Sequence, residues 1–287
     1  MKLAQRIVLG YYRLKFKLLE LISPKIAAKE AFELFCTPYS RKRKSEAPEA
    51  FKMAEKVSLS VHNNTVQGFK WVPEQTKGIK ILIVHGFDSR SYRFDKYIEP
   101  LVNEGLEVFA FDAPGHGLSS GKTINALLYR DMILKAIEDH GPFDGIMAHS
   151  FGGIAVSLAI EELQSNLPKR LILIAPSTET TRSVTDFSPF LHLSKKLKNE
   201  LENLILEISK YPVSWFSVAR VIQKATVRTL WIHDLKDNIT PYEDMKHLRE
   251  LNLPHVEFLI TEGLGHSLYR EDEIVDKIIM FLKELTI

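Results

Sequence analysis

Short apolar runs recur along the chain, and most of them end in a polar or small residue. Such runs are typical of strands that are buried on both faces of a parallel sheet. Helical stretches separate them, so strand alternates with helix. The sequence therefore predicts an α/β fold, a doubly wound and mostly parallel sheet with its chemistry at the carboxyl ends of the strands. We expect strands at 57–61, 66–72, 81–84, 108–111, 146–148, 171–174, 230–232 and 256–260, and helices near 93–104, 123–139, 151–165, 242–251 and 271–285.

One connection in this alternation is too long. About fifty residues separate the strand that ends near Ile174 from the one that starts near Val227. A simple crossover needs far fewer, so we expect residues 177–226 to form a helical lid insertion over the catalytic edge. Extra helical packing is the alternative. The core then comprises residues 51–176 and 227–287. The insertion has an apolar helical face and an aromatic cluster, formed by Leu197, Leu201, Leu204 and Ile208 and by Tyr211, Trp215 and Phe216.

Charge divides the chain into a basic arm, residues 1–50, and an acidic body. Residues 1–44 hold eleven basic and three acidic residues in a chain whose net charge is +2. The acidic body argues against a nucleic-acid partner. Within the arm, a stripe at helical spacing indicates a basic amphipathic helix, which consists of Leu3, Ile7, Tyr11, Leu14, Leu18 and Leu21 with Lys2, Arg6, Arg13, Lys15 and Lys17 around it.

Two interpretations of this arm stay open. The helix packs on the chain's own body or on a second subunit, which we favour, or residues 1–22 make peripheral contact with an anionic membrane. The run 41–44 is read as a solvated linker. No apolar run approaches a membrane span, and the N-terminus is a poor signal peptide. We therefore expect a cytoplasmic protein, peripheral at most to the inner face of a membrane.

The strongest chemical motif is Ala148-His149-Ser150-Phe151-Gly152-Gly153. It follows an expected strand and opens an expected helix. A serine at such a sharp turn is pushed out of the sheet, and the turn requires small residues two positions before and after it. Ala148 and Gly152 meet that need, so Ser150 is the candidate nucleophile of an elbow that His149 and the small residues support. A helix N-cap serine is the alternative.

A serine hydroxyl needs a general base and an acid that orients the base. In this architecture the chain order is Ser, then Asp or Glu, then His. His266 lies on a glycine-rich loop after the last strand and is the candidate base. Asp234 and Asp237 both follow the preceding strand. We favour Asp237, and the acid that is not used is expected to be solvated at the surface.

A developing oxyanion needs backbone donors. The amide of Phe151, directly after the nucleophile, is one candidate, and the amide of Phe87, in the loop after the strand 81–84, is the other. No cofactor is needed for this chemistry. The ten histidines show no metal-ligand spacing, so no metal is expected, and the single cysteine, Cys36, excludes an internal disulfide.

Five motifs in order resemble the α/β-hydrolase fold superfamily from about residue 57 to the end. The resemblance implies a lid-bearing serine hydrolase of the esterase, lipase or thioesterase kind. It also implies that the acid stands at Asp237, four residues before Pro241, and that Asp112 and His116 are structural. The motifs are His85-Gly86-Phe87, Asp112-Ala113-Pro114-Gly115-His116-Gly117-Leu118-Ser119, Ala148 to Gly153, Asp237-Asn238-Ile239-Thr240-Pro241 and Gly265-His266.

We therefore expect a serine hydrolase whose partner is a small-molecule ester or thioester with an apolar acyl group. Its catalytic residues are Ser150, Asp237 and His266. A lyase or acyltransferase that uses the same triad, and a binding protein that does no chemistry, are the alternatives, because a fold hosts many functions. The sequence does not indicate an oligomeric state.

Overall fold

The computed structural model describes residues 3–39, 46–163 and 166–286. Two compact units make up the chain. Met1–Thr37 and Glu179–Ser217 form the first, which we call the helical unit. Pro38–Thr178 and Val218–Ile287 form the second, which we call the sheet unit. The division into arm, core and lid that the sequence suggests, with boundaries at 50, 176 and 226, stays a prediction. Lys2 and the run 41–44 lie outside the described residues.

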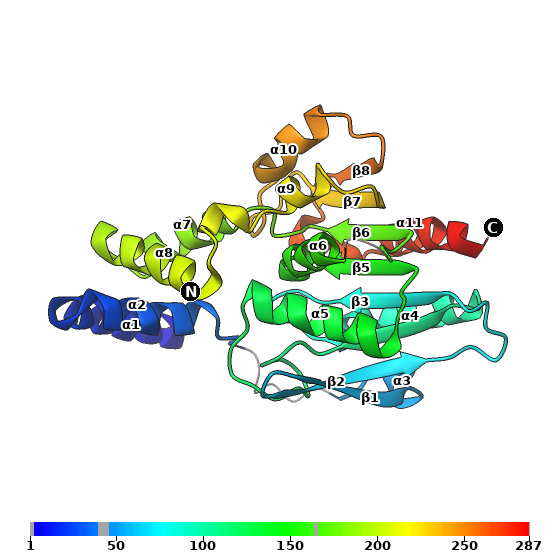
Figure 1. Cartoon of the computed structure of the whole chain (residues 1–287), viewed down its shortest axis with the longest axis horizontal. Coiled ribbons are helices and arrows are strands. Elements are labelled where there is room, and N and C mark those ends of the chain that lie inside the picture. The colour runs from blue at the N-terminus through cyan, green and yellow to red at the C-terminus, as the bar shows by residue number, and fades with distance from the viewer. Residues whose placement is uncertain (1–2, 40–45, 164–165, 287) are drawn as a thin grey trace. The chain divides into compact units, whose positions relative to one another are not determined.

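Eight strands form one sheet in the order β1-β2-β4-β3-β5-β6-β7-β8 (Figure 1). Strands β3 to β8 run parallel, whereas β2 is antiparallel to both β1 and β4. All eight expected strands are present, and the mostly parallel sheet is confirmed. Their bounds are β1 Glu55–Val61, β2 Asn64–Trp71, β3 Lys80–Val84, β4 Glu107–Phe111, β5 Gly145–His149, β6 Arg170–Ile174, β7 Arg228–Asp234 and β8 Val256–Thr261.

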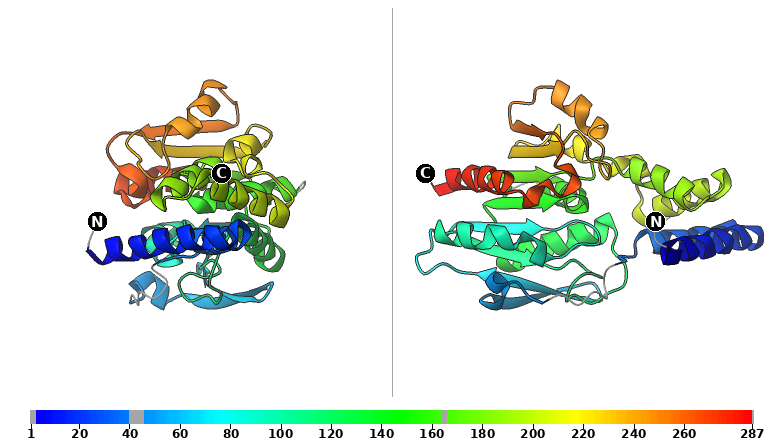
Figure 2. Two further views of the ribbon diagram at one scale, coloured as in Figure 1. Left: turned by 90° about the vertical axis from the view of Figure 1, so that its left-hand side faces the viewer. Right: turned by 180° about the vertical axis from the view of Figure 1, so that it is seen from behind.

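Helices cover both faces of this sheet. Helices α5 and α6 lie on one face, and α4 and α11 lie on the other, as the views from the front and from behind show (Figures 1 and 2). Both faces are therefore apolar, and this explains why the central strands are continuous apolar runs. The helices of the sheet unit are α3 Glu49–Lys52, α4 Asp95–Asn103, α5 Ala126–His140, α6 Phe151–Glu162, α9 Val218–Ile222, α10 Glu243–Glu250 and α11 Asp272–Lys283.

The helical unit joins two segments that are far apart in the sequence. The N-terminal segment forms α1 Leu3–Ile22 and α2 Pro24–Phe35, and the insertion forms α7 Thr180–Phe190 and α8 Lys195–Ser209. Pro24 separates the first two helices, since proline suits the first position of a helix and Ser23 caps it. A shared apolar core holds the segments together, formed by Leu9, Phe16, Ala27, Ala28, Ala31, Leu34, Leu191 and Leu197.

The buried face of α1 is not the stripe that the sequence indicates. Leu9 and Phe16 are buried, whereas the predicted stripe from Ile7 to Leu21 is exposed. The interpretation that this stripe packs on the chain's own body is therefore wrong for these side chains. Helix α1 is apolar on two faces, and the one that packs is marked by fewer residues. No helix in the described part of the chain combines the length and the apolar character that a membrane span requires.

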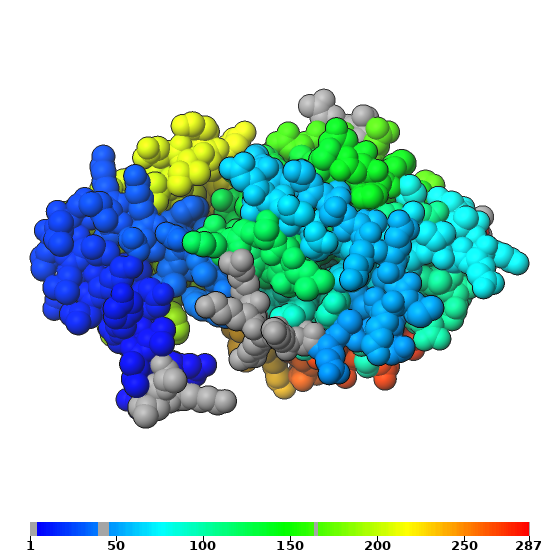
Figure 3. Space-filling model, turned by 90° about the horizontal axis from the view of Figure 1, so that it is seen from below, coloured from blue at the N-terminus to red at the C-terminus, as the bar shows by residue number. Residues whose placement is uncertain are grey.

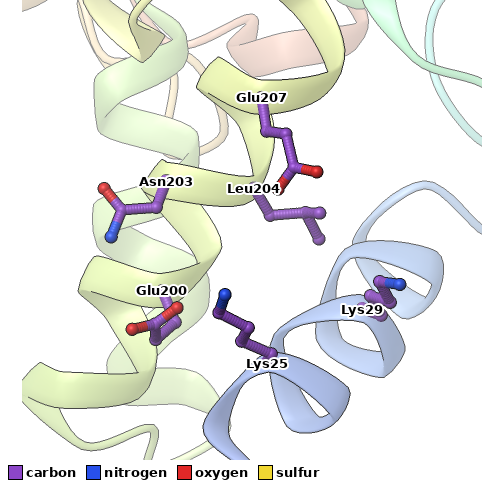
Figure 4. Close-up of a pocket in the computed structure, with 6 residues that line it drawn as sticks. All are labelled: Lys25, Lys29, Glu200, Asn203, Leu204 and Glu207. Carbon is purple, nitrogen blue, oxygen red and sulfur yellow. The ribbon is translucent and has the colours of Figure 1, made fainter.

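A polar pocket of about 440 Å³ lies between α2 and α8 (Figure 4). It is lined by Lys25, Lys29, Glu200, Asn203, Leu204 and Glu207. None of the candidate catalytic residues borders this pocket, and its lining offers no nucleophile with an adjacent base. The chemistry therefore has to be sought at the sheet.

Candidate active site

Ser150 lies at a strained turn between β5 and α6. Its backbone angles are φ 53° and ψ −121°, in a region that residues with a side chain rarely adopt. Neighbouring glycines make the turn feasible: a Cβ atom on Gly152 would lie 2.7 Å from the carbonyl oxygen of His85, and one on Gly86 would lie 2.9 Å from the Cβ of Ser150. Ala148 is fully buried beneath the turn. This geometry matches the expected elbow.

The side chain of Ser150 does not cap helix α6. Its Oγ lies 3.0 Å from Nε2 of His266 instead. On the other side of the imidazole ring, Nδ1 of His266 lies 2.8 Å from Oδ2 of Asp237. Three residues from three loops, predicted in this order from the sequence, therefore form one continuous hydrogen-bonded chain. With Nδ1 donating to the carboxylate, Nε2 is free to accept the serine proton.

The Asp237 carboxylate is held as an anion by its neighbours. Oδ1 accepts hydrogen bonds from the amides of Ile239 and Thr240 at 2.8 and 3.0 Å, and Oδ2 accepts one from the Thr240 hydroxyl at 2.8 Å. Burial by itself would raise the pKa of Asp237, but the hydrogen bonds from His266 and Thr240 outweigh it and lower the pKa to about 2. Thr240 was not singled out from the sequence, although its spacing three residues after an aspartate is typical of such a turn.

His149 contacts the candidate base, His266, through its backbone and its ring. Its Nε2 donates to the backbone carbonyl of His266 at 3.0 Å, and its ring contacts the rings of His266 and Tyr269 with centroids 4.7 and 4.4 Å away. Burial lowers the pKa of His149 to about 3, so the ring is neutral at pH 7. The Nδ1 atom is buried without a hydrogen-bond partner among the described residues. His149 therefore holds the backbone at His266, the candidate base.

The second acid, Asp234, is not solvated, and the expectation that it lies at the surface is wrong. Its side chain is fully buried at the end of β7. Oδ2 accepts from the Thr261 hydroxyl at 2.7 Å and from the Leu264 amide at 2.9 Å, while Oδ1 accepts from the amide of Gly263 at 3.2 Å. Burial would raise the pKa of Asp234, but these hydrogen bonds lower it to about 2. Asp234 thus fastens the loop that carries His266.

The two candidate oxyanion donors come from the loop after β3 and from the start of α6, two segments that meet at Ser150. Phe87 follows β3, Phe151 is the first residue of α6, and their rings are in edge-to-face contact with centroids 5.8 Å apart. Within the described residues, no carbonyl accepts a hydrogen bond from either amide. Phe87 and Phe151 therefore stay the candidate donors.

Asp112 and His116 organise the loops next to the elbow. Asp112 accepts hydrogen bonds from the Ser91 amide and hydroxyl at 2.9 and 2.8 Å and from the Leu118 amide at 2.8 Å. His116 accepts one through Nε2 from the Asp88 amide at 3.1 Å. Burial lowers the pKa of His116 to about 3, which keeps it neutral and able to accept. Neither side chain is hydrogen-bonded to the Ser150–His266–Asp237 chain, in agreement with a structural role.

The insertion leaves the sheet unit directly beside the elbow. The amide of Ser177 donates to the backbone carbonyl of Ser150 at 3.0 Å. One residue later, the carbonyl of Thr178 accepts a hydrogen bond from the amide of Val218 at 2.9 Å. This bond joins the segment that leads into the insertion to the segment that returns from it. The connection that the sequence marks as too long therefore begins and ends next to the candidate nucleophile.

The chain is similar to known hydrolases. A family model described as serine aminopeptidase, S33, matches residues 74–215. Monoglyceride lipase of Homo sapiens is 24% identical over 212 residues, which cover 69% of this chain and 68% of that protein. A Pyrococcus furiosus esterase structure gives a TM-score of 0.63 at 19% identity and covers 86% of this chain and 96% of its own. Mouse alpha/beta hydrolase domain-containing protein 10 gives 0.61 at 17% identity, over 81% of this chain and 98% of its own.

The strand order, the elbow and these similarities define the class: the chain belongs to the α/β-hydrolase fold superfamily. The resemblance inferred from the motifs is thereby confirmed. The family model includes Phe87 and Ser150 but ends before Asp237 and His266. The assignment of those two residues therefore rests on the distances within the site.

Proposed function

We propose that this protein is a serine hydrolase that cleaves a carboxylic ester or thioester with an apolar acyl group through an acyl-enzyme on Ser150. The observation that carries the proposal is the hydrogen-bonded chain from Ser150 through His266 to Asp237. A binding protein has no need of a strained serine aimed at an oriented imidazole. The similarity to a monoglyceride lipase and to an esterase supports ester bonds as the target.

In the first half of the reaction, Ser150 Oγ attacks the acyl carbon while His266 Nε2 takes the hydroxyl proton. The carbonyl oxygen becomes an oxyanion, which the amides of Phe87 and Phe151 stabilise. Each such donor typically contributes about 2.7–4 kcal/mol to transition-state stabilisation. Asp237 keeps the Nδ1 proton in place and stabilises the imidazolium. His266 then donates its Nε2 proton to the leaving alcohol or thiol as the bond to the acyl carbon breaks.

In the second half, water replaces the leaving group. His266 takes a proton from the water while the water oxygen attacks the acyl carbon of the ester on Ser150. The tetrahedral intermediate collapses, the Ser150 oxygen regains a proton from His266, and the free acid leaves. No step uses a cofactor.

A fluorophosphonate probe tests for the activated serine. We expect the wild-type protein to be labelled and Ser150→Ala and His266→Ala to lose labelling. Ser58→Ala, an exposed serine on β1, is the matched control and keeps it. Labelling that survives in Ser150→Ala, or a folded wild-type protein that is not labelled, contradicts the proposal.

Product analysis separates hydrolysis from acyl transfer. We expect p-nitrophenyl esters and monoacylglycerols to release free acid, and turnover to increase with acyl chain length. An added alcohol or thiol that captures most of the acyl group identifies an acyltransferase instead. Preferential cleavage of aminoacyl amides identifies a peptidase.

The lid function of residues 177–226 also stays a proposal. Tyr211 and Trp215 stack within the insertion with ring centroids 3.9 Å apart, and Tyr211 is partly exposed. If the insertion contacts the acyl group, Tyr211→Ala raises KM for long-chain esters and leaves turnover of acetate esters unchanged. An unchanged chain-length preference contradicts the lid function.

A further inference from the structure

Helix α1 carries a continuous apolar face that nothing in the described structure covers. Its side chains are spaced four, three, four and three residues apart, which places them on one side of the helix. Their exposed fractions range from 52% to 80%, for Ile7, Tyr11, Leu14, Leu18, Leu21 and Ile22. We call this set the outer face of α1. Leu9 and Phe16, on the opposite side, are buried in the helical unit.

The outer face differs from ordinary surface apolar residues in its continuity. Met53, Val72 and Met280 are also exposed, but they lie apart in the sheet unit: Met53 follows α3, Val72 follows β2, and Met280 is on α11. Single exposed apolar residues are normal, whereas a continuous apolar strip on a folded protein marks an interaction surface. Figure 3 shows the N-terminal helices, in dark blue, at the surface of the helical unit.

Cations border the outer face, and the acidic residue of α1 does not. Arg6 and Lys17 are exposed along its edge. The helix contains one acid, Glu20, which accepts a hydrogen bond from the Ser194 hydroxyl of the helical unit. Lys15 pairs with Glu30 at 2.7 Å, so its charge is engaged within the unit. The free edge of the face is therefore apolar and positive.

We propose that α1 lies in the plane of an anionic lipid surface, with its outer face buried among the acyl chains and Arg6 and Lys17 against the headgroup phosphates. An apolar face with a basic border is the pattern of interfacial helices. The proposal does not depend on the hydrolase function, since it concerns the helical unit alone.

A second copy of this chain fits the outer face less well. In a symmetric pair of α1 helices, Arg6 and Lys17 of one copy would approach the same cations of the other. The single acid of the helix is engaged with Ser194 and offers no compensation. Phosphate groups supply the missing negative charge, which is why we infer a lipid surface rather than self-association.

Vesicle flotation of the full chain tests this inference. We expect binding to vesicles of phosphatidylcholine with phosphatidylglycerol to exceed binding to phosphatidylcholine alone by about tenfold or more, since an anionic surface attracts both Arg6 and Lys17. The double variant Leu14→Glu with Leu18→Glu loses binding to both vesicle types. Met280→Glu, which changes an equally exposed apolar residue on α11, leaves binding unchanged.

Further variants separate the charge from the apolar face. Arg6→Glu with Lys17→Glu removes the preference for anionic vesicles, and high salt does the same. Because all these positions are exposed, we expect unchanged thermal unfolding in each variant. Vesicle binding that the Leu14→Glu, Leu18→Glu variant retains, or no binding by the wild type, overturns the proposal. A dimer in sedimentation velocity that only this variant dissociates, without vesicle binding, assigns the face to a second copy instead.

Discussion

Exchanging the carboxylate of Asp237 for an amide isolates the orientation of the base. Oδ1 accepts hydrogen bonds from the backbone amides of Ile239 and Thr240 at 2.8 and 3.0 Å. In Asp237→Asn the amide oxygen must take this position, because an NH2 group there would face two donors. The NH2 group then points at Nδ1 of His266, which has to accept. The imidazole proton moves to Nε2, where it blocks transfer from Ser150.

The expected loss in kcat is about 10⁴-fold, the typical cost of the wrong histidine tautomer in a serine triad. This corresponds to about 5.5 kcal/mol of transition-state stabilisation. The free energy of unfolding changes less than this. The pKa of Asp237 is lowered from 3.8 to about 2, and at 1.36 kcal/mol per pKa unit the carboxylate contributes at most about 2.5 kcal/mol at pH 7.

Asp234→Asn is the matched comparison, since it makes the same exchange, of one carboxylate oxygen for an NH2 group, at the neighbouring acid. Either orientation of this amide leaves the donors of one oxygen facing an NH2 group, and the loop that carries His266 loosens. We expect a loss of about 2–3 kcal/mol in unfolding free energy and a decrease in kcat of about tenfold. The assays are steady-state turnover of p-nitrophenyl butyrate and urea unfolding. If Asp234→Asn lowers kcat far more than Asp237→Asn, the acid has been assigned to the wrong residue.

Three further predictions concern packing, pH and thiol chemistry. Gly152→Ala lowers kcat by at least about a hundredfold, because its Cβ would lie 2.7 Å from the rigid His85 carbonyl oxygen; Gly10→Ala, whose Cβ meets nothing within 4 Å, leaves kcat unchanged and stabilises α1. His149 has a pKa of about 3 in the folded protein and 6.5 in the unfolded chain, so the stability that the neutral ring contributes is present above pH 6.5 and falls by about 2 kcal/mol between pH 7 and pH 5. We expect the free energy of unfolding in urea to depend less on pH in His149→Phe, and an equal pH dependence in the two proteins refutes this. Burial raises the pKa of the Cys36 thiol to about 12, so Ellman's reagent modifies it at pH 8 only in denaturant; rapid modification of the native chain contradicts that burial.

The sheet and the residues of the hydrogen-bonded chain from Ser150 to Asp237 could be predicted because their signals are local. A strand buried on both faces is a continuous apolar run, so β3 to β7 are recognisable one at a time. The elbow, likewise, needs small residues at fixed positions around Ser150, and the sequence has them at Ala148 and Gly152. Chain order indicates His266 and an acid at Asp234 or Asp237, and the family resemblance favours Asp237, although only the folded structure brings Asp237 within hydrogen-bonding distance of His266.

What could not be predicted depends on contacts between distant segments. The sequence favours Asp237 as the acid but does not indicate the role of Asp234, because only the pairing of β7 with β8 brings the Gly263–Leu264 amides onto Asp234. The only sign of this contact in the sequence is the glycine-rich loop that follows β8, the strand next to β7.

Helix α1 shows the same limit, because periodicity reveals an apolar stripe but not which of two faces is covered. The buried face is selected by α2 and by the insertion, which lies more than 150 residues further along the chain.

The central claim is that the acyl group passes through Ser150, and mass spectrometry of the protein quenched during turnover tests it most directly. With a p-nitrophenyl ester in excess, we predict a burst of p-nitrophenol equal to the protein concentration. We also predict one acyl group per chain, on the peptide that contains Ser150, and none in Ser150→Ala. Turnover without an adduct, or an adduct on another residue, would contradict the account.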